Sequence, residues 1–365
     1  MSEAQTEAER LMRICNACRY CEGLCAVFPA MEMRKAFKEG DLNYLANLCH
    51  NCGGCYHACQ YAPPHEFGVN VPKTLAQVRN ESYRAYVWPR ILAPLMEKNG
   101  AVITLVTIFS VCAFIAAFML LTTSSVMFGV VTGEGAFYKI MSHNAMALLF
   151  GGAFLYVILA LVMGFRAFWK DIRAEQSVLS DGGSVFQAMK DVATLRYLDG
   201  EGAGCGNENE RPDKRRRLFH HMTFYGFLLC FASTSLATLY HYIGGWEAPY
   251  DFFSLPVIFG TVGGIGISIG PVGLYYLKSK RLPELGADNR GMDSAFLLML
   301  AAVGVSGLAL MILRATGFMG TLLALHLGLV LAFFLMMPYS KFVHGIYRAG
   351  ALVYYAIEQR RNRSG

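Results

Sequence analysis

Residues 15–25 read CNACRYCEGLC, and residues 49–59 read CHNCGGCYHAC. Both stretches have the same spacing, Cys-x2-Cys-x2-Cys-x3-Cys. Three thiolates from one tight loop, together with a more distant fourth thiolate, suit a cubane iron–sulfur cluster. Because the spacing occurs twice near the start of the chain, the sequence predicts two [4Fe–4S] clusters in a small N-terminal domain.

The pairing of the eight cysteines follows the pattern of two-cluster ferredoxins, in which the fourth cysteine of each run binds the other cluster. The first cluster is then bound by Cys15, Cys18, Cys21 and Cys59, and the second by Cys49, Cys52, Cys55 and Cys25. A zinc site needs four ligands and does not require the third cysteine of each run. Disulfides need an oxidising compartment, and residues 1–13 carry no apolar signal segment. We therefore expect iron–sulfur clusters.

The rest of the chain resembles membrane protein sequence, since 55% of all residues are hydrophobic and only 16% are charged. Crossing a hydrocarbon core of ~30 Å takes roughly 20 apolar residues. Stretches of this length without a charged residue predict transmembrane helices over Ala101–Leu121, Ile140–Phe165, Leu218–Trp246, Phe252–Leu277, Ser294–Leu313 and Ala315–Ser340.

The basic residues predict the orientation of these six spans. Residues 166–217 contain ten Lys and Arg, whereas the opposite loops offer only Lys139 and Arg314. Cytoplasmic loops are enriched in Lys and Arg, so both termini are expected in the cytoplasm, with the spans in a bacterial cytoplasmic (inner) membrane. The net charge of +6 then reports topology and gives no indication of a nucleic-acid partner.

The expected fold class is mainly α, with a two-cluster, ferredoxin-like helical domain followed by a six-helix transmembrane bundle. Asp41 is expected to cap a helix over residues 42–48, and Pro72 to begin one that runs to about Tyr86. The expected divisions are a cluster domain and connector (1–90), two transmembrane helices (91–165), a cytoplasmic basic loop (166–217), a haem-binding four-helix core (218–347) and a cytoplasmic tail (348–365).

Histidines at membrane depth indicate a further cofactor, because ionisable residues there usually face a cavity or a ligand. His326 and His344 are 18 residues apart, or five turns and about 27 Å on a single helix, and would share one face. This arrangement predicts haem b with two axial imidazoles. A merely interfacial position remains the alternative for any one of these histidines, and His50, His57 and His65 are interpreted as local polar residues of the cluster domain.

Two resemblances extend this interpretation. Leu218–Tyr347 resembles the cytochrome b of the respiratory nitrate reductase gamma subunit, with the entry Leu218-Phe219-His220 and a last helix that contains His326 and His344. The whole chain resembles the tricarballylate or citrate utilisation protein B family, through RRLFHHMTFYGF at 216–227, LYHY at 239–242 and both cysteine runs. The cluster domain also resembles the small iron–sulfur subunit of heterodisulfide reductases.

The resemblance implies haem ligands, with one haem expected and a second possible. His344 pairs with His221, or alternatively with His220. Adjacent residues of a helix point about 100° apart, so the two histidines cannot both face His344. His221 is preferred because Gly226 in its turn would leave room for a macrocycle. A second haem would use His241 and His326, with His143 as the alternate, and a cytoplasmic quinone site would use His220, Tyr339 and Lys341. The alternative for Tyr339 and Lys341 is a role as interfacial anchors.

The family resemblance also implies the reaction: the protein reoxidises the flavin of a soluble FAD-dependent dehydrogenase of tricarballylate, or of a related tricarboxylate, and reduces membrane quinone. No dinucleotide-binding fingerprint, phosphate loop or nucleophile arrangement is present in the sequence. The chain is therefore expected to be the electron-transferring component of an oxidoreductase and not its substrate-oxidising subunit. The alternatives are a quinol-oxidising subunit of a heterodisulfide-reductase-like complex, a non-catalytic membrane anchor or a redox sensor; a transporter would not need eight cluster cysteines.

Overall fold

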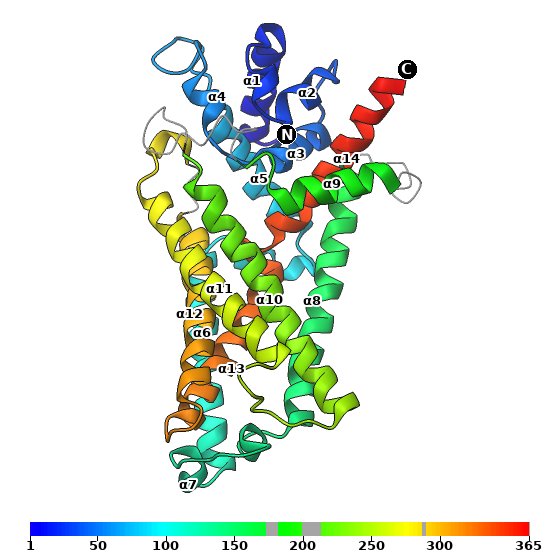
Figure 1. The fold of residues 1–365 in the computed structure, drawn as a ribbon. Coiled ribbons are helices and arrows are strands. Elements are labelled where there is room, and N and C mark those ends of the chain that lie inside the picture. The colour runs from blue at the N-terminus through cyan, green and yellow to red at the C-terminus, as the bar shows by residue number, and fades with distance from the viewer. Residues whose placement is uncertain (173–181, 199–212, 287–289, 365) are drawn as a thin grey trace.

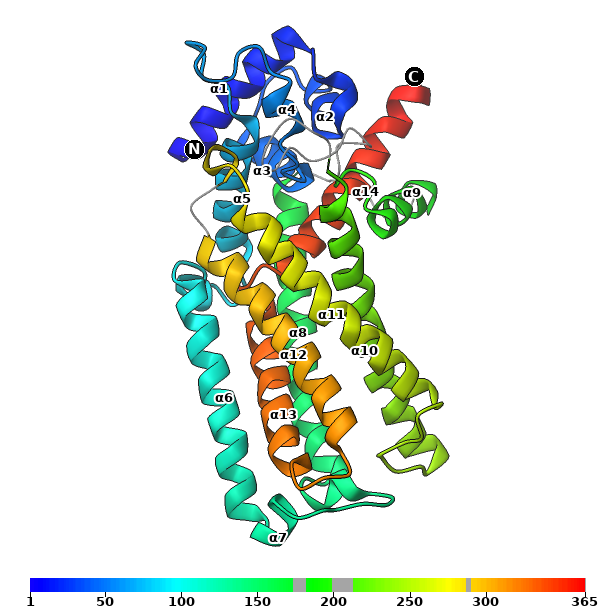
Figure 2. The same cartoon turned by 60° about the vertical axis from the view of Figure 1, so that its left-hand side comes forward.

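The computed structural model describes residues 1–172, 182–198, 213–286 and 290–364. Over these residues the chain is helical, with no strand, so the predicted mainly α class is confirmed. The cluster domain (residues 1–90) lies at one end of the long helices in both views (Figures 1 and 2). Its helices are α1 (Glu3–Cys18), α2 (Val27–Glu32), α3 (Glu39–Leu48), α4 (Gly54–His57) and α5 (Val71–Tyr86).

Local signals explain where these helices begin. The α5 helix starts at Val71 with Pro72 in its first turn, as predicted, and the Asn70 side chain accepts a hydrogen bond from the Lys73 N–H at 3.1 Å. The prediction for Asp41 was wrong in detail. Helix α3 begins two residues before Asp41, at Glu39, and the Asp41 carboxylate reaches back to accept from the Lys38 N–H at 3.0 Å.

Six described helices are long and apolar enough to cross a membrane, as predicted from the uncharged stretches. The protein is accordingly a multi-pass membrane protein. The six helices are α6 (Asn99–Leu121), α8 (His143–Asp171), α10 (Arg215–Gly244), α11 (Leu255–Ser279), α12 (Arg290–Leu313) and α13 (Met319–Met336).

Helices α10 and α11 form an antiparallel pair with close backbone contact (Figure 1). A Cβ at Gly226 would stand 2.8 Å from the backbone nitrogen of Ile267 and 3.0 Å from the carbonyl oxygen of Gly263. Small residues allow such approach between membrane helices. The idea that Gly226 leaves room for a macrocycle was therefore wrong, because α11 occupies that side of the glycine.

The expectation that His326 and His344 share one helix was also wrong. Helix α13 ends at Met336, a short 3₁₀ helix covers Met337–Tyr339, and α14 runs over Val343–Ser364. Pro338 has no N–H for a helical hydrogen bond, and its ring clashes with the preceding turn. The two histidines therefore belong to different helices, and their spacing along the sequence does not set their relative direction.

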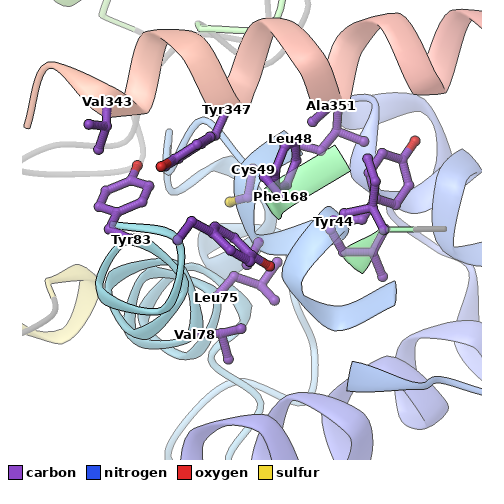
Figure 3. Packing of buried hydrophobic residues seen from close by; sticks show 14 of the residues in the cluster. Tyr44, Leu48, Cys49, Leu75, Val78, Tyr83, Phe168, Val343, Tyr347 and Ala351 are labelled. Atoms are coloured by element: carbon purple, nitrogen blue, oxygen red, sulfur yellow. The ribbon is translucent and has the colours of Figure 1, made fainter. Parts of the chain in front are cut away.

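Helix α14 leaves the membrane bundle and enters the cluster domain (Figures 1 and 2). Figure 3 shows Tyr347 of α14 beside Tyr83 and Phe168, and the ring centroids of Tyr347 lie 5.8 Å from Tyr83 of α5 and 5.3 Å from Phe168 of α8. All three side chains are buried. One continuous apolar core thus joins the cluster domain, a membrane helix and α14, which fixes the clusters' domain on the bundle.

Within the predicted basic loop, residues 182–194 form the helix α9 (Gly182–Thr194), which packs against α14 (Figure 1). The hydroxyl of Tyr225 on α10 donates to the Ala193 carbonyl at 2.8 Å. Residues 173–181 and 199–212 of the predicted loop, including Cys205, which we interpret as a loop thiol, lie outside the described residues.

Candidate functional site

The structure gathers the eight cysteines into two cups. The outer cup is lined by the set Cys15, Cys18, Cys21 and Cys59, together with Tyr20 and Gln60. The inner cup is lined by the set Cys25, Cys49, Cys52 and Cys55, together with His50 and Tyr197. Each cup therefore holds three cysteines of one run and the last cysteine of the other, the grouping expected from the crossover.

The chemistry of the cups fits a cluster. Burial, with the neighbouring cysteine sulfurs, raises the pKa of Cys15 to about 12 and that of Cys21 to about 11. The same causes raise the pKa of Cys25 and Cys55 well above the usual range for a thiol. Thiols that resist ionisation need a nearby cation to hold them as thiolates, and the irons of a cluster supply that charge.

Within the described residues, no three His, Cys, Asp or Glu side chains are arranged around a single ion. Each cup brings together four cysteines, which is the donor set of a cubane with one thiolate for each iron.

Local backbone geometry turns the second cysteine run around the inner cup. Asn51 and Gly53 have positive φ angles of 53° and 84°, a conformation that asparagine and glycine tolerate better than other residues. The Asn51 N–H then points at the Cys49 sulfur at 3.3 Å. This contact places a backbone donor on a sulfur of the inner cup.

Arginines from several elements converge on the main chain of residues 49–51, which we call the inner loop. The carbonyl oxygen of Cys49 accepts from Arg79 at 2.6 Å and from Arg348 at 3.0 Å. Arg216 donates to the carbonyls of His50 at 2.9 Å and of Asn51 at 2.8 Å, and Arg281 also reaches the Asn51 carbonyl at 2.8 Å. The inner cup is thereby fastened to α5, α10, α14 and the segment after α11.

These arginines were missed as site residues. Arg216, Arg281 and Arg348 were interpreted only as topology signals, and Arg79 was not singled out. A local signal did exist, because Arg216 precedes His220 by four residues and Arg348 follows His344 by four. Residues four apart lie on one face of a helix, so each arginine was predictable as a neighbour of a histidine.

His220 and His344 lie together at the end of the bundle next to the cluster domain, each one helical turn from Arg216 or Arg348. Their ring centroids are 6.0 Å apart and their planes cross at 78°. Two imidazoles on opposite faces of one metal ion, with metal–nitrogen distances of roughly 2 Å, have ring centroids about 6 Å apart. The ring separation therefore fits an axial pair.

The protonation of His344 also suits a haem iron. Nδ1 of His344 lies 2.5 Å from the Lys341 carbonyl oxygen, which can only accept, so Nδ1 carries the proton and Nε2 keeps its lone pair. Burial, with the nearby Arg348, lowers the pKa of His344 well below its ordinary value, so the ring stays neutral.

The other histidines are arranged differently. His221 packs on Tyr225 with a centroid distance of 5.7 Å, so the structure places His220 and not His221 beside His344. His241 stacks on His143 at 3.6 Å with an angle of 18°. His326 Nδ1 lies 3.0 Å from the Ser306 hydroxyl, and within the described residues its ring contacts neither His241 nor His143. The expected second haem set is not brought together.

The candidate quinone residues fall into separate networks. The Tyr339 hydroxyl lies 2.5 Å from that of Tyr156 and 3.2 Å from the Trp88 carbonyl. The Lys341 ammonium pairs with Asp293 at 3.1 Å, and Asp293 also binds Lys278 at 2.6 Å. Burial lowers the pKa of Lys341, and Asp293 opposes this effect. His220 belongs to neither network.

Comparison with known proteins gives a consistent result. Residues 96–365 match the family described as Citrate utilization protein B, and residues 8–85 match the Citrate utilization protein B Fer4-like domain. A curated Escherichia coli protein named Citrate utilization protein B is 48% identical over 365 residues, covering 100% of this chain and 95% of that protein. No solved structure matches. The predicted family is thus confirmed, and the chain belongs to the citrate utilization protein B family.

Proposed function

We propose that this protein is a membrane electron carrier of tricarboxylate utilisation. Electrons enter at the outer cup, pass to the inner cup, reach haem b at His220 and His344, and leave on a membrane quinone. Family membership and the Fer4-like match support the iron–sulfur part. The observation that carries the proposal is the succession of three sites, in which the inner loop is bound by Arg216 and Arg348, each one turn from a histidine of the pair.

The electron donor is the reduced flavin of a soluble FAD-dependent dehydrogenase of tricarballylate or a related tricarboxylate. The name of the Escherichia coli relative points to citrate and related acids. The outer cup supports entry from a soluble partner, because Tyr20 on its rim is 73% exposed and the cup lies in the domain beyond the bundle (Figure 2). The partner therefore docks on the cluster domain and the 166–217 loop.

Bound clusters and haem supply one-electron chemistry, and the chain supplies their positions. The thiolates of the two cups hold the clusters, and the Asn51 N–H hydrogen-bonds a ligand sulfur. His344, oriented by the Lys341 carbonyl, and His220 would hold the haem iron. One haem has a paired site of this kind, and a second haem would require His326 and His241 to move.

The quinone is reduced at the cytoplasmic side, near Lys341 and Tyr339. Full reduction of a quinone takes up two protons with two electrons, so the site needs a proton donor at its rim. Lys341, held by Asp293, carries such protons. The basic loop and tail support an orientation with both termini in the cytoplasm of a bacterium and the bundle in its inner membrane.

The test begins with full-length protein purified from membranes. We expect about eight irons per chain, two [4Fe–4S] signals by electron paramagnetic resonance, and a low-spin haem spectrum. Cys59→Ser should damage the outer cluster and Cys25→Ser the inner one. Cys112→Ser, which changes a cysteine outside both cups, is the matched control. Damage by Cys25→Ser to the outer cluster alone would contradict the crossover.

Turnover is then measured with the flavoprotein, the tricarboxylate and a quinone. Quinone reduction should require the flavoprotein, and oxidation of tricarballylate without it would contradict the division of labour. Clusters without any quinone-linked turnover would indicate an anchor or a sensor. Cluster and haem midpoint potentials above that of the quinone would indicate a quinol-oxidising subunit.

A further inference from the structure

The two cups differ in the positive charge that surrounds them. Four guanidinium groups donate to the inner loop, from Arg79, Arg216, Arg281 and Arg348. The outer cup has Arg19 in its lining, but this side chain is exposed and donates to the Asn16 carbonyl of its own helix at 3.1 Å. The main chain of the inner cup is therefore enclosed by cations, and that of the outer cup is not.

Arg79 and Arg348 stand out because they share one acceptor. Both donate to the carbonyl oxygen of Cys49, a cysteine of the inner cup. Arg79 is only 4% exposed. In the part of the chain that the structure describes, neither arginine forms an ion pair with a carboxylate, and the Nε atom of each is buried without an acceptor. The two charges therefore lack a nearby compensating anion.

Guanidinium groups of arginine carry a positive charge in proteins at neutral pH. Burial, with the repulsion from Arg79, lowers the pKa of Arg348, but only to about 10. A four-thiolate cubane is an anion, and reduction by one electron makes it more negative. Net charge, hydrogen bonds and solvent exposure set the potentials of such clusters, and a buried unpaired cation favours the more negative form because the interior screens charge poorly.

We infer that Arg79 and Arg348 are positioning residues that raise the reduction potential of the inner cluster above that of the outer cluster. This inference rests on the proposed function. One electron leaves the reduced outer cluster and reduces the oxidised inner cluster, with no bond made or broken and no proton moved. The arginines favour transfer of the electron to the inner cluster. The inner cluster is therefore reduced first, and it passes electrons to the histidine pair, which lies one helical turn from Arg348.

The test is a redox titration of purified full-length protein, followed by electron paramagnetic resonance. The inner cluster is identified as the signal that Cys25→Ser removes. We expect Arg79→Gln and Arg348→Gln each to lower the one-electron equilibrium constant for inner-cluster reduction about tenfold or more, which is 59 mV or more. The outer cluster should change less than threefold. Arg13→Gln, which alters an exposed arginine paired with Glu9, is the control and should move neither cluster.

The lysine variants separate charge from hydrogen bonding. Arg79→Lys and Arg348→Lys keep the charge and should hold the inner potential within threefold of the unaltered protein. An unchanged inner cluster in both glutamine variants, or an equal shift of both clusters, would overturn the inference. If the glutamine variants lose the iron of the inner cup, the lysine variants decide. A tenfold change of the equilibrium constant for inner-cluster reduction in either lysine variant would then overturn the inference. Protein without two clusters would instead refute the proposed function.

Discussion

Replacing Arg34 by glutamine tests how firmly α14 holds the cluster domain. Arg34 is 8% exposed and donates to Asp41 at 2.9 Å and to Glu358 of α14 at 2.7 Å, with its guanidinium 4.6 Å from the Tyr44 ring centroid. Breaking a buried pair by removing one partner costs about 3–5 kcal/mol, because the remaining charge is uncompensated. The Asp41 and Glu358 side chains keep 23% and 17% exposure, so water offsets part of this cost. We expect a loss of about 3 kcal/mol.

Hydrogen exchange of α14 measures this loss where it occurs, since local opening free energies set the exchange rates. About 3 kcal/mol corresponds to roughly 100-fold faster exchange in the part of α14 beyond Ala351. Arg34→Lys keeps the charge and should lower the free energy of opening of α14 by about 1 kcal/mol. Arg13→Gln, at an exposed ion pair, should lower stability by less than about 1 kcal/mol. An increase below tenfold in Arg34→Gln would refute the view that this ion pair anchors α14.

Three further outcomes are expected. His344→Ala and His220→Ala should each remove the low-spin haem spectrum, whereas His221→Ala should keep it. Haem that is retained in His220→Ala but lost in His221→Ala would reverse the assignment. Gly226→Ala should lower the free energy of unfolding of the bundle by about 1–3 kcal/mol, because the new methyl group meets the α11 backbone at 2.8 Å. An unchanged unfolding temperature would contradict this packing. Tyr339→Phe combined with Lys341→Ala should slow quinone reduction about tenfold at unchanged haem content, and an unaltered rate would remove both residues from the quinone site.

The sequence predicted the features that depend on local spacing or on length. The spacing of the cysteine runs indicated three thiols of each cup, the pattern of two-cluster ferredoxins indicated the fourth, and apolar length alone indicated the six spans. The error at His326 and His344 was avoidable, because Pro338 between them already marked a helix end.

The choice between His220 and His221 was not accessible in the same way. The rotation of α10 about its axis decides which histidine faces α14, and close contact with α11 at Gly226 contributes to that rotation. Such contact depends on residues distant in sequence. The spacing of Arg216 and Arg348 from the histidines was readable, but the contacts of the arginines with the inner loop were not, because their acceptors are backbone carbonyls, which every residue carries and no sequence pattern reveals.

The positive charges at this end of the bundle therefore have more than one physical effect. Lys and Arg on the cytoplasmic side favour the orientation of the spans, yet Arg216 and Arg348 also bind the inner loop. Helices α10 and α14 both begin near this loop, at Arg215 and Val343, and a helix N-terminus carries a partial positive charge. An anionic cluster in the inner cup would be attracted to these groups. Loss of the cluster should then loosen the cluster domain from the bundle, since the arginines would remain buried with their repulsion uncompensated.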